Sequence, residues 1–234
     1  MTGWSEIWKN RSCNSADPSH TLTLEDLLLA DGYDTDTGRV SISDFQKYIH
    51  SISQTCGIQP GESLFDVGMG AGAFLFPWYL DGHPVGGLDY SAPLISLALR
   101  IMPGATKEFV VCDASHMDTG KKYDIVLSSG VFLYFPDHHY ARTVVEKMIS
   151  KSQKTIAILD IPDMAQREIT EKFRHASLPP GEYEERYRGL DHLYFARSWF
   201  HEIADASGLE ISVSDQHIPH YANGRFRFNV VMKK

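Results

Sequence analysis

The chain has 234 residues, 43% of them hydrophobic and 22% charged, and it carries a formal net charge of −8 at pH 7. That length suits one α/β domain, residues 1–234, with a sizeable core. The negative charge disfavours DNA or RNA as a substrate, because binding to a polyanion relies on Lys and Arg, and no apolar run reaches the roughly eighteen residues of a membrane span.

The first forty residues do not read as part of a sheet, and we expect residues 1–40 to form an N-terminal cover over an active site. Trp4 and Trp8 are spaced to share one helical face, so packing onto the domain is their expected role. An acidic turn over residues 31–38 invites comparison with a calcium-binding loop. Its acids are out of register with the ligand positions, so the sequence argues against calcium.

The N-terminus lacks the basic start and apolar run of a secretory signal. The three cysteines, Cys13, Cys56 and Cys112, are an odd number without metal-like spacing. We expect a cytoplasmic protein without a bound metal, acting as a monomer or homodimer on a small molecule and not at a membrane.

Strand-like and helix-like segments alternate from residue 43 onward. Ser43 begins a capping box with Gln46, Pro136 opens a second helix, and Ser198 caps a third. Strands separated by helices imply a parallel sheet with helices on both faces, the α/β class. The strand-like runs are Ser63–Val67, Val85–Asp89, Glu108–Cys112, Asp124–Ser128, Thr155–Ile161, Leu209–Ser214 and Phe226–Met232.

The first strand runs directly into a loop with three alternating glycines, Gly68, Gly70 and Gly72. Asp66 supplies a carboxylate at the strand end, and the glycines let backbone N–H groups approach a ligand with no Cβ in the way. Asp89 ends the next strand, where a carboxylate can accept the ribose hydroxyl protons of an adenosine. Methyltransferases and dinucleotide-dependent oxidoreductases both use this arrangement.

Four motifs in order resemble the class I S-adenosylmethionine-dependent methyltransferases of the small-molecule type. They are Asp66-x-Gly68-x-Gly70-x-Gly72, Gly87-Leu88-Asp89-Tyr90-Ser91, Cys112-Asp113-Ala114 and Tyr123-Asp124-Ile125-Val126-Leu127-Ser128-Ser129. The resemblance covers residues 45–160 well and the C-terminal third more loosely. It implies a Rossmann-like, doubly wound, seven-stranded sheet, mostly parallel with a C-terminal antiparallel hairpin, and S-adenosyl-L-methionine as the cofactor.

The resemblance also implies individual roles. The glycines would pack against the methionine part of the cofactor, Asp89 would hold the ribose, and Asp113 would take the adenine amino group. Taken singly, each residue could equally be a turn glycine or a helix cap; the ordered set favours the cofactor. The expected cofactor-binding residues are Asp66, Gly68, Gly70, Gly72, Asp89, Tyr90, Asp113, Ala114 and Ser129.

An NAD(P)-dependent oxidoreductase is the main alternative, because Gly68-x-Gly70-x-x-Ala73 satisfies the relaxed dinucleotide fingerprint. Asp66 argues against it, since its charge would repel a pyrophosphate and suits a cationic amino group. A protein-substrate methyltransferase and a non-catalytic relative that binds the cofactor are further alternatives, and the acidic charge leaves a basic peptide substrate open.

Residues 162–197 also do not fit the sheet, and we expect them to form an inserted lid that helps to choose the substrate. The expected reaction is methyl transfer to an oxygen or nitrogen of a small-molecule acceptor by in-line displacement. A general base is needed where the nucleophile is protonated. The candidates are His192, which leads, His138 and His139, with Tyr194 as the orienting residue and His217 and His220 as further candidates.

Overall fold

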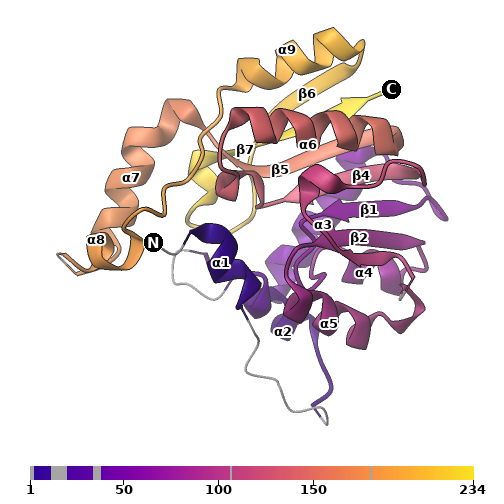
Figure 1. Ribbon diagram of the computed structural model, residues 1–234, viewed down its shortest axis with the longest axis horizontal. Coiled ribbons are helices and arrows are strands. Elements are labelled where there is room, and N and C mark those ends of the chain that lie inside the picture. Colours follow the sequence, from indigo (N-terminus) through magenta and orange to yellow (C-terminus); the bar gives the residue numbers. More distant parts are fainter. Residues whose placement is uncertain (1–2, 12–19, 34–37, 106, 180) are drawn as a thin grey trace.

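A seven-stranded sheet in the order β3-β2-β1-β4-β5-β7-β6 forms the centre of the molecule (Figure 1). The computed structural model describes residues 3–11, 20–33, 38–105, 107–179 and 181–234. Strands β1 to β5 pair in parallel, and β7 lies antiparallel between β5 and β6, so the predicted fold is confirmed. The strands are β1 Leu64–Val67, β2 Val85–Asp89, β3 Phe109–Val111, β4 Tyr123–Ser129, β5 Ser152–Pro162, β6 Glu210–Asp215 and β7 Arg227–Lys233.

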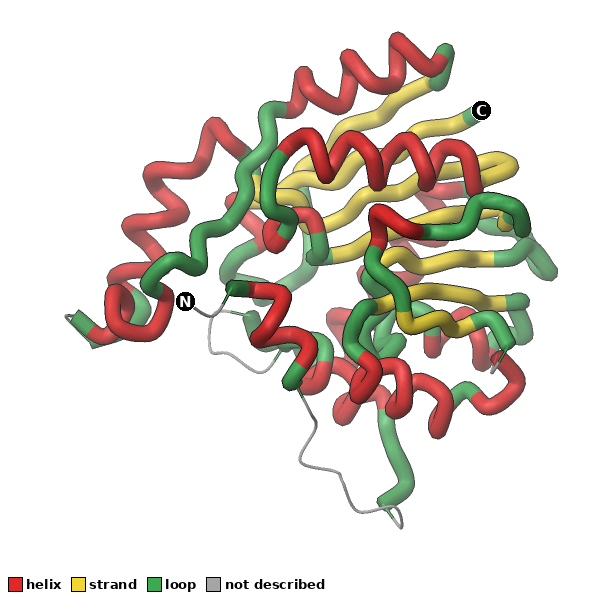
Figure 2. The backbone as a smooth tube through the Cα atoms, in the orientation of Figure 1, coloured by secondary structure: helices red, strands yellow, loops and turns green. Residues whose placement is uncertain are grey.

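Helices flank the sheet on both faces (Figure 2). In Figure 1, α6 lies in front of the sheet and α3 behind it, while α1, α7 and α8 gather on the left, at the carboxyl ends of the parallel strands. The helices are α1 Trp4–Lys9, α2 Leu24–Ala30, α3 Ile42–Cys56, α4 Phe76–Leu80, α5 Ala92–Ile101, α6 His138–Lys151, α7 Arg167–Ala176, α8 Glu182–Tyr187 and α9 Arg197–Ser207.

The alternation of side chains along the strands divides the core into two layers. Leu64 of β1 packs in a cluster with residues of α3, α4 and α5. Its neighbours Phe65 and Val67 pack in a second cluster with residues of α6 and α9. Since successive strand residues point to opposite faces and both faces are covered, each central strand reads as a continuous apolar run. For this reason the sequence alone predicts the central strands.

Helix starts are where the sequence predictions were wrong. Ser41, not Ser43, caps α3, and it accepts a hydrogen bond from the Asp44 backbone N–H. α6 begins at His138 and is capped by Asp137, so Pro136 lies outside the helix. α9 already begins before Ser198, whose side chain therefore does not cap it. A cap needs extended backbone just outside the helix, and each predicted cap lies one or two residues away from that position.

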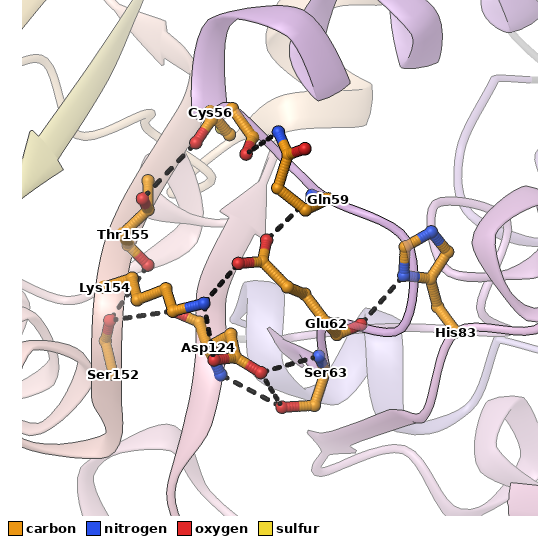
Figure 3. A network of polar contacts seen from close by, with 10 residues as sticks. Cys56, Gln59, Glu62, Ser63, His83, Asp124, Ser152, Lys154 and Thr155 are labelled. Atoms are coloured by element: carbon orange, nitrogen blue, oxygen red, sulfur yellow. Dashed lines mark hydrogen bonds and ion pairs between the residues drawn. The ribbon is translucent and has the colours of Figure 1, made fainter.

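A polar network closes the opposite edge of the sheet, where the parallel strands begin (Figure 3). The Asp124 carboxylate, at the start of β4, accepts hydrogen bonds from the backbone N–H and the hydroxyl of Ser63, both at 2.9 Å. Lys154 of β5 forms ion pairs with Asp124, at 3.3 Å, and with Glu62. The Ser63 N–H, followed by the other donors, holds the pKa of Asp124 below its usual value. The network therefore stabilises the aligned starts of β1, β4 and β5.

We expect Asp124→Asn to lower the free energy of unfolding by about 1–2 kcal/mol at pH 7, because charge-assisted hydrogen bonds to Ser63 and Lys154 are lost. The pKa of Asp124 is lower in the folded than in the unfolded chain. Its contribution is therefore complete at neutral pH and is lost as the pH falls below about 4. Urea unfolding of both proteins from pH 7 to pH 3 should show the difference shrinking, with the exposed Asp81→Asn as control. A difference that is constant with pH would contradict this account.

Candidate active site

The glycine loop after β1 is built around close contacts that exclude side chains. Gly68, Gly70 and Gly72 have φ values of +79°, +55° and +86°. A Cβ on Gly68 would lie 2.6 Å from Val131, and one on Gly72 would lie 2.5 Å from Met102. The predicted glycines therefore combine left-handed backbone with tight packing at the end of the central strand.

Asp89 fastens this loop to the end of β2. Its two carboxylate oxygens accept the backbone N–H groups of Gly70, at 3.0 Å, and Ser91, at 2.8 Å. Asp66 lies on the neighbouring strand and is 2% exposed, and its Oδ1 has no hydrogen-bond partner among the described residues. The two predicted acids are thus brought together, and one of them has an unused acceptor atom.

Asp31, which the sequence analysis did not assign to the site, enters the same loop from the end of α2. Its carboxylate accepts the N–H groups of Ala71, at 2.6 Å, and Ala73, at 3.0 Å, and it fills the space that a Cβ of Gly70 would take. We had considered Asp31 only as part of the acidic turn, of which residues 34–37 lie outside the described residues. The chain separation of about forty residues leaves no local signal for this contact.

The loop therefore gathers three carboxylates that repel one another. Burial, and then the charges of Asp31 and Asp89, raise the pKa of Asp66 well above its usual value. Burial raises the pKa of Asp31 to about 7 and also raises that of Asp89. A cationic ligand group would relieve this repulsion and could donate to the unpartnered Oδ1 of Asp66. S-Adenosylmethionine, with an ammonium that can donate and a sulfonium, fits this set of acceptor carboxylates, whereas a pyrophosphate does not.

A second group of predicted residues lies beyond β2 and β3. Asp113 begins a short 3₁₀ turn, η2 (Ala114–His116), and its Oδ1 accepts the Ser115 N–H at 2.8 Å and the Tyr140 hydroxyl at 2.7 Å. Ala114 is buried beside it. The sequence analysis does not assign Tyr140 to the site, because its contact with Asp113 joins residues that are 27 positions apart in the chain. These residues form the wall at which the adenine is expected.

Tyr90 and Ser129 mark two further strand ends. Tyr90 follows β2 and lies partly buried, with Lys9 of α1 5.9 Å from its ring centroid. Ser129 ends β4, and its buried hydroxyl has no partner among the described residues. The N-terminal helix therefore reaches over the strand ends that carry the predicted cofactor residues.

The two predicted covers meet at this edge. Trp4 of α1 donates from Nε1 to the Asp191 carbonyl at 3.0 Å, and its ring lies 4.8 Å from Tyr134, which follows β4. Trp8 lies 5.2 Å from the same tyrosine. Trp4 and Trp8 thus pack onto the domain and link the N-terminal segment to the lid segment 162–197, which contains α7 and α8 (Figure 1).

His192 and Tyr194 lie inside this assembly. The His192 ring packs 5.3 Å from Trp4 and 5.7 Å from Tyr134, and its buried Nδ1 has no partner among the described residues. Burial, followed by the charges of Arg174 and Arg227, holds the pKa of His192 well below its usual value. The Tyr194 hydroxyl is likewise buried without a hydrogen-bond partner. A neutral imidazole with a free nitrogen is available here.

The other candidate histidines have different surroundings. His138 contacts the Tyr194 carbonyl through Nε2 at 3.0 Å and packs against aromatic rings. His139, His217 and His220 are exposed, and His220 pairs with Asp44 at 2.9 Å. The geometry therefore favours His192 over these four.

Two buried charged residues were missed by the sequence analysis. Asp160 of β5 has φ +59°, in the left-handed region that non-glycine residues rarely adopt, and its carboxylate accepts the Tyr221 hydroxyl at 3.0 Å. Arg227 begins β7 and is 5% exposed. The sequence analysis assigns neither residue to the site.

Two properties concern the described part of the chain only. Its His, Cys, Asp and Glu side chains form no group of three or more that could hold a metal ion. No helix in that part is both long and apolar enough to cross a membrane.

Comparisons with known proteins agree with this architecture. Residues 64–151 match the family model described as a methyltransferase domain. No curated protein matches the chain. The structure resembles magnesium protoporphyrin IX methyltransferase from Synechocystis PCC 6803 with bound S-adenosylhomocysteine, at 19% identity and a TM-score of 0.59, covering 89% of this chain and 95% of that one.

Two further solved structures show the same fold. DesVI from Streptomyces venezuelae has 16% identity and a TM-score of 0.60, covering 91% of this chain and 99% of that one. The N-methyltransferase NodS from Bradyrhizobium japonicum WM9, in complex with S-adenosylhomocysteine, has 14% identity and a TM-score of 0.57, covering 88% and 94%. The resemblance that the four motifs indicated is confirmed.

We expect Asp89→Ala to weaken S-adenosylmethionine binding at least tenfold, or about 1.4 kcal/mol, because the glycine loop loses its tie to β2 and the ligand loses an acceptor. Isothermal titration calorimetry measures the change, and thermal unfolding checks that the variant is folded. Asp81→Ala removes the same group from an exposed position and should bind normally. Equal affinities of both variants would remove Asp89 from the site.

Cofactor binding should also release protons between about pH 6 and pH 7.5. Asp31, with a pKa of about 7, is partly protonated before binding, and a nearby cation favours its ionised form, so affinity rises with pH across this range. Calorimetry in two buffers of different ionisation enthalpy measures the release. S-Adenosylhomocysteine, which lacks the sulfonium charge, should release fewer protons, and Asp31→Asn should abolish most of the effect. Identical release with both ligands would contradict this electrostatic account.

Proposed function

We propose that this S-adenosylmethionine-dependent methyltransferase methylates an oxygen or nitrogen of a small-molecule acceptor. The observation that carries the proposal is the contact between the two covers, in which Trp4 bonds to Asp191 across the carboxyl edge of the sheet. A closed edge suits a small acceptor better than a peptide segment, which needs an open groove. We therefore rank a protein substrate second, and propose a cytoplasmic enzyme that acts as a monomer or homodimer.

The names of two similar structures support a small-molecule acceptor. One is a methyltransferase of magnesium protoporphyrin IX, and another is named as an N-methyltransferase. An NAD(P)-dependent oxidoreductase is disfavoured, because the carboxylates of Asp31, Asp66 and Asp89 would repel a pyrophosphate in the glycine loop.

The residues of the chain have three tasks in this reaction. The glycine loop and Asp66, Asp89 and Asp113 would hold the cofactor, which supplies an activated sulfonium methyl group when bound. The covers exclude water and fix the acceptor in line with that group, and such positioning can contribute ~7–11 kcal/mol to lowering the barrier. The remaining task is to accept the proton of the acceptor.

We propose that His192 accepts this proton. Its Nδ1 is buried and has no partner among the described residues, and its depressed pKa keeps the ring neutral at physiological pH. Nδ1 of His192 would accept the proton that the acceptor oxygen or nitrogen loses when the methyl group leaves the cofactor sulfur for that atom, and would pass the proton to solvent. Tyr194, two residues further on, is proposed to orient the acceptor through its hydroxyl. His138 and His139 are the less favoured assignments, since one is engaged with the Tyr194 carbonyl and the other is exposed.

His192→Gln should lower kcat by about 10² or more, the range typical of losing a general base, and should change the affinity for S-adenosylmethionine little. Turnover is followed as S-adenosylhomocysteine produced from a panel of hydroxylated and amino small molecules. The matched control His139→Gln should retain activity. Turnover of His192→Gln equal to wild type would remove His192 from the mechanism.

A further inference from the structure

Burial opposes the charge of the Arg227 guanidinium, but the carboxylate of Asp160 and other groups around it raise the pKa of Arg227 above its usual value. Its Nε and Nη1 atoms are inaccessible to solvent and have no hydrogen-bond partner among the described residues. No carboxylate in that part of the chain lies within the 4.0 Å of an ion pair. Asp160 offsets the buried charge in part, but buried N–H groups are ordinarily hydrogen-bonded, so Nε and Nη1 remain available to an acceptor atom of a ligand.

Two polar groups on which the charge of Arg227 acts are also unpaired. The Tyr194 hydroxyl, which can donate, and His192 Nδ1, which is an acceptor in the neutral ring, are buried and lack partners among the described residues. Arg174 of α7 adds positive charge to the surroundings of both side chains. Several donors and positive charges that converge on one interior position are complementary to an anion.

A cavity open to the surface is lined in part by Arg227, whereas Tyr194, His192 and Asp160 are not among the residues that line it. It has a volume of about 660 Å³, within the range of small-molecule sites, and Arg227, Tyr221 and Gln216 are among its lining residues. The acids in its wall are already engaged, because Arg197 pairs with Asp163 at 2.9 Å and with Asp215 at 2.6 Å. The charge of Arg227 therefore remains available to a ligand.

Asp160 gives the site a direction. The pairing of β5 with β7 shifts register between Ile158 and Ile161, and Asp160 sits in this irregularity with its left-handed backbone. Tyr221 and Gln216 hold its carboxylate at 3.0 Å and 3.3 Å, and Oδ2 lies 3.6 Å from where a Cβ of Gly130 would be. Strained residues of this kind concentrate at functional sites. One end of the site is thus cationic, and the other is a carboxylate beside the end of β4.

We propose that the methyl acceptor carries a carboxylate or phosphate group that Arg227 binds with the Tyr194 hydroxyl, leaving the acceptor's hydroxyl or amine within reach of Nδ1 of His192. The inference rests on the proposed function and adds to it the chemical class of the acceptor. Arg227 acts as a specificity-determining residue, because a neutral molecule would leave its buried charge without a counter-charge from the ligand.

The test is direct titration of the full chain with simple probes, with and without S-adenosylhomocysteine. Benzoate and phenyl phosphate carry the two anionic groups, and benzamide is the neutral counterpart of similar shape. Calorimetry and thermal unfolding should show binding and a stabilising shift with at least one of the anions, and neither effect with benzamide. The anion that binds more tightly shows whether the acceptor carries a carboxylate or a phosphate group.

Variants assign the effect to Arg227. Arg227→Met should weaken anion binding by at least about tenfold, and thermal unfolding checks that the variant remains folded. Arg227→Lys keeps the charge and should retain part of the binding. Arg142→Met removes the same group from α6, where the guanidinium lies 5.6 Å from the Trp199 ring, and should bind anions normally.

Three results would overturn the proposal: no binding of either anion to the wild type, equal binding of benzamide, or unchanged anion binding by Arg227→Met. None of them depends on methyl transfer. If the wild type does not bind S-adenosylhomocysteine, or methylates none of the acceptors, the proposed function is contradicted instead. The titrations without cofactor would still test the anion site.

Discussion

The repulsion among Asp31, Asp66 and Asp89 is the constraint on which the site depends. Backbone N–H groups of the glycine loop compensate Asp31 and Asp89 in part, but Oδ1 of Asp66 has no donor among the described residues. Bringing like charges into a buried loop costs free energy that a cationic ligand returns on binding. Because Asp31 belongs to the N-terminal segment, the same charge balance ties the position of that segment to the state of the cofactor loop. If the cofactor binds this loop as we propose, its binding and the placement of the N-terminal segment are coupled through Asp31.

The two edges of the sheet divide stability from function. At the amino edge, Asp124, Lys154 and Ser63 satisfy one another and align the starts of three strands. At the carboxyl edge, burial coexists with unsatisfied groups. The buried side-chain atoms without a partner in the described part of the chain belong to Trp8, Asp66, Ser91, Ser129, His192, Tyr194 and Arg227. Asp66, Ser91, Ser129 and Arg227 lie on or beside strand ends at this edge, and Trp8, His192 and Tyr194 belong to the two predicted covers, whereas buried polar groups are ordinarily paired. The unpaired polar atoms at this edge are available to form hydrogen bonds with ligands.

The sequence predicts those features of the fold and of the site that depend on residues close together in the chain. The strands, the glycine loop and Asp89 follow from apolar runs and turn chemistry within a few residues. The cap of α3 could not be chosen on such grounds, because Ser41-x-x-Asp44 and Ser43-x-x-Gln46 both fit a capping pattern. Asp31, Asp160 and Arg227 were missed for a different reason. Their roles arise from contacts between segments distant along the chain, and Arg227 in particular looks like an ordinary surface residue until β7 is placed beside β5.

The positive charges around His192 affect how strongly this residue would act as a base. Arg174 and Arg227, together with burial, keep His192 neutral and also make it a weak base. An anion at Arg227 would cancel part of that positive field and so raise the affinity of Nδ1 for a proton. On this arrangement, the acceptor that fills the anion site also activates the base, and the site without acceptor has a weaker base to offer to water. A neutral molecule of the same shape would gain neither the ion pair nor the stronger base. Selectivity would then reside in proton transfer as well as in binding, which is the differential stabilisation of the transition state that catalysis requires.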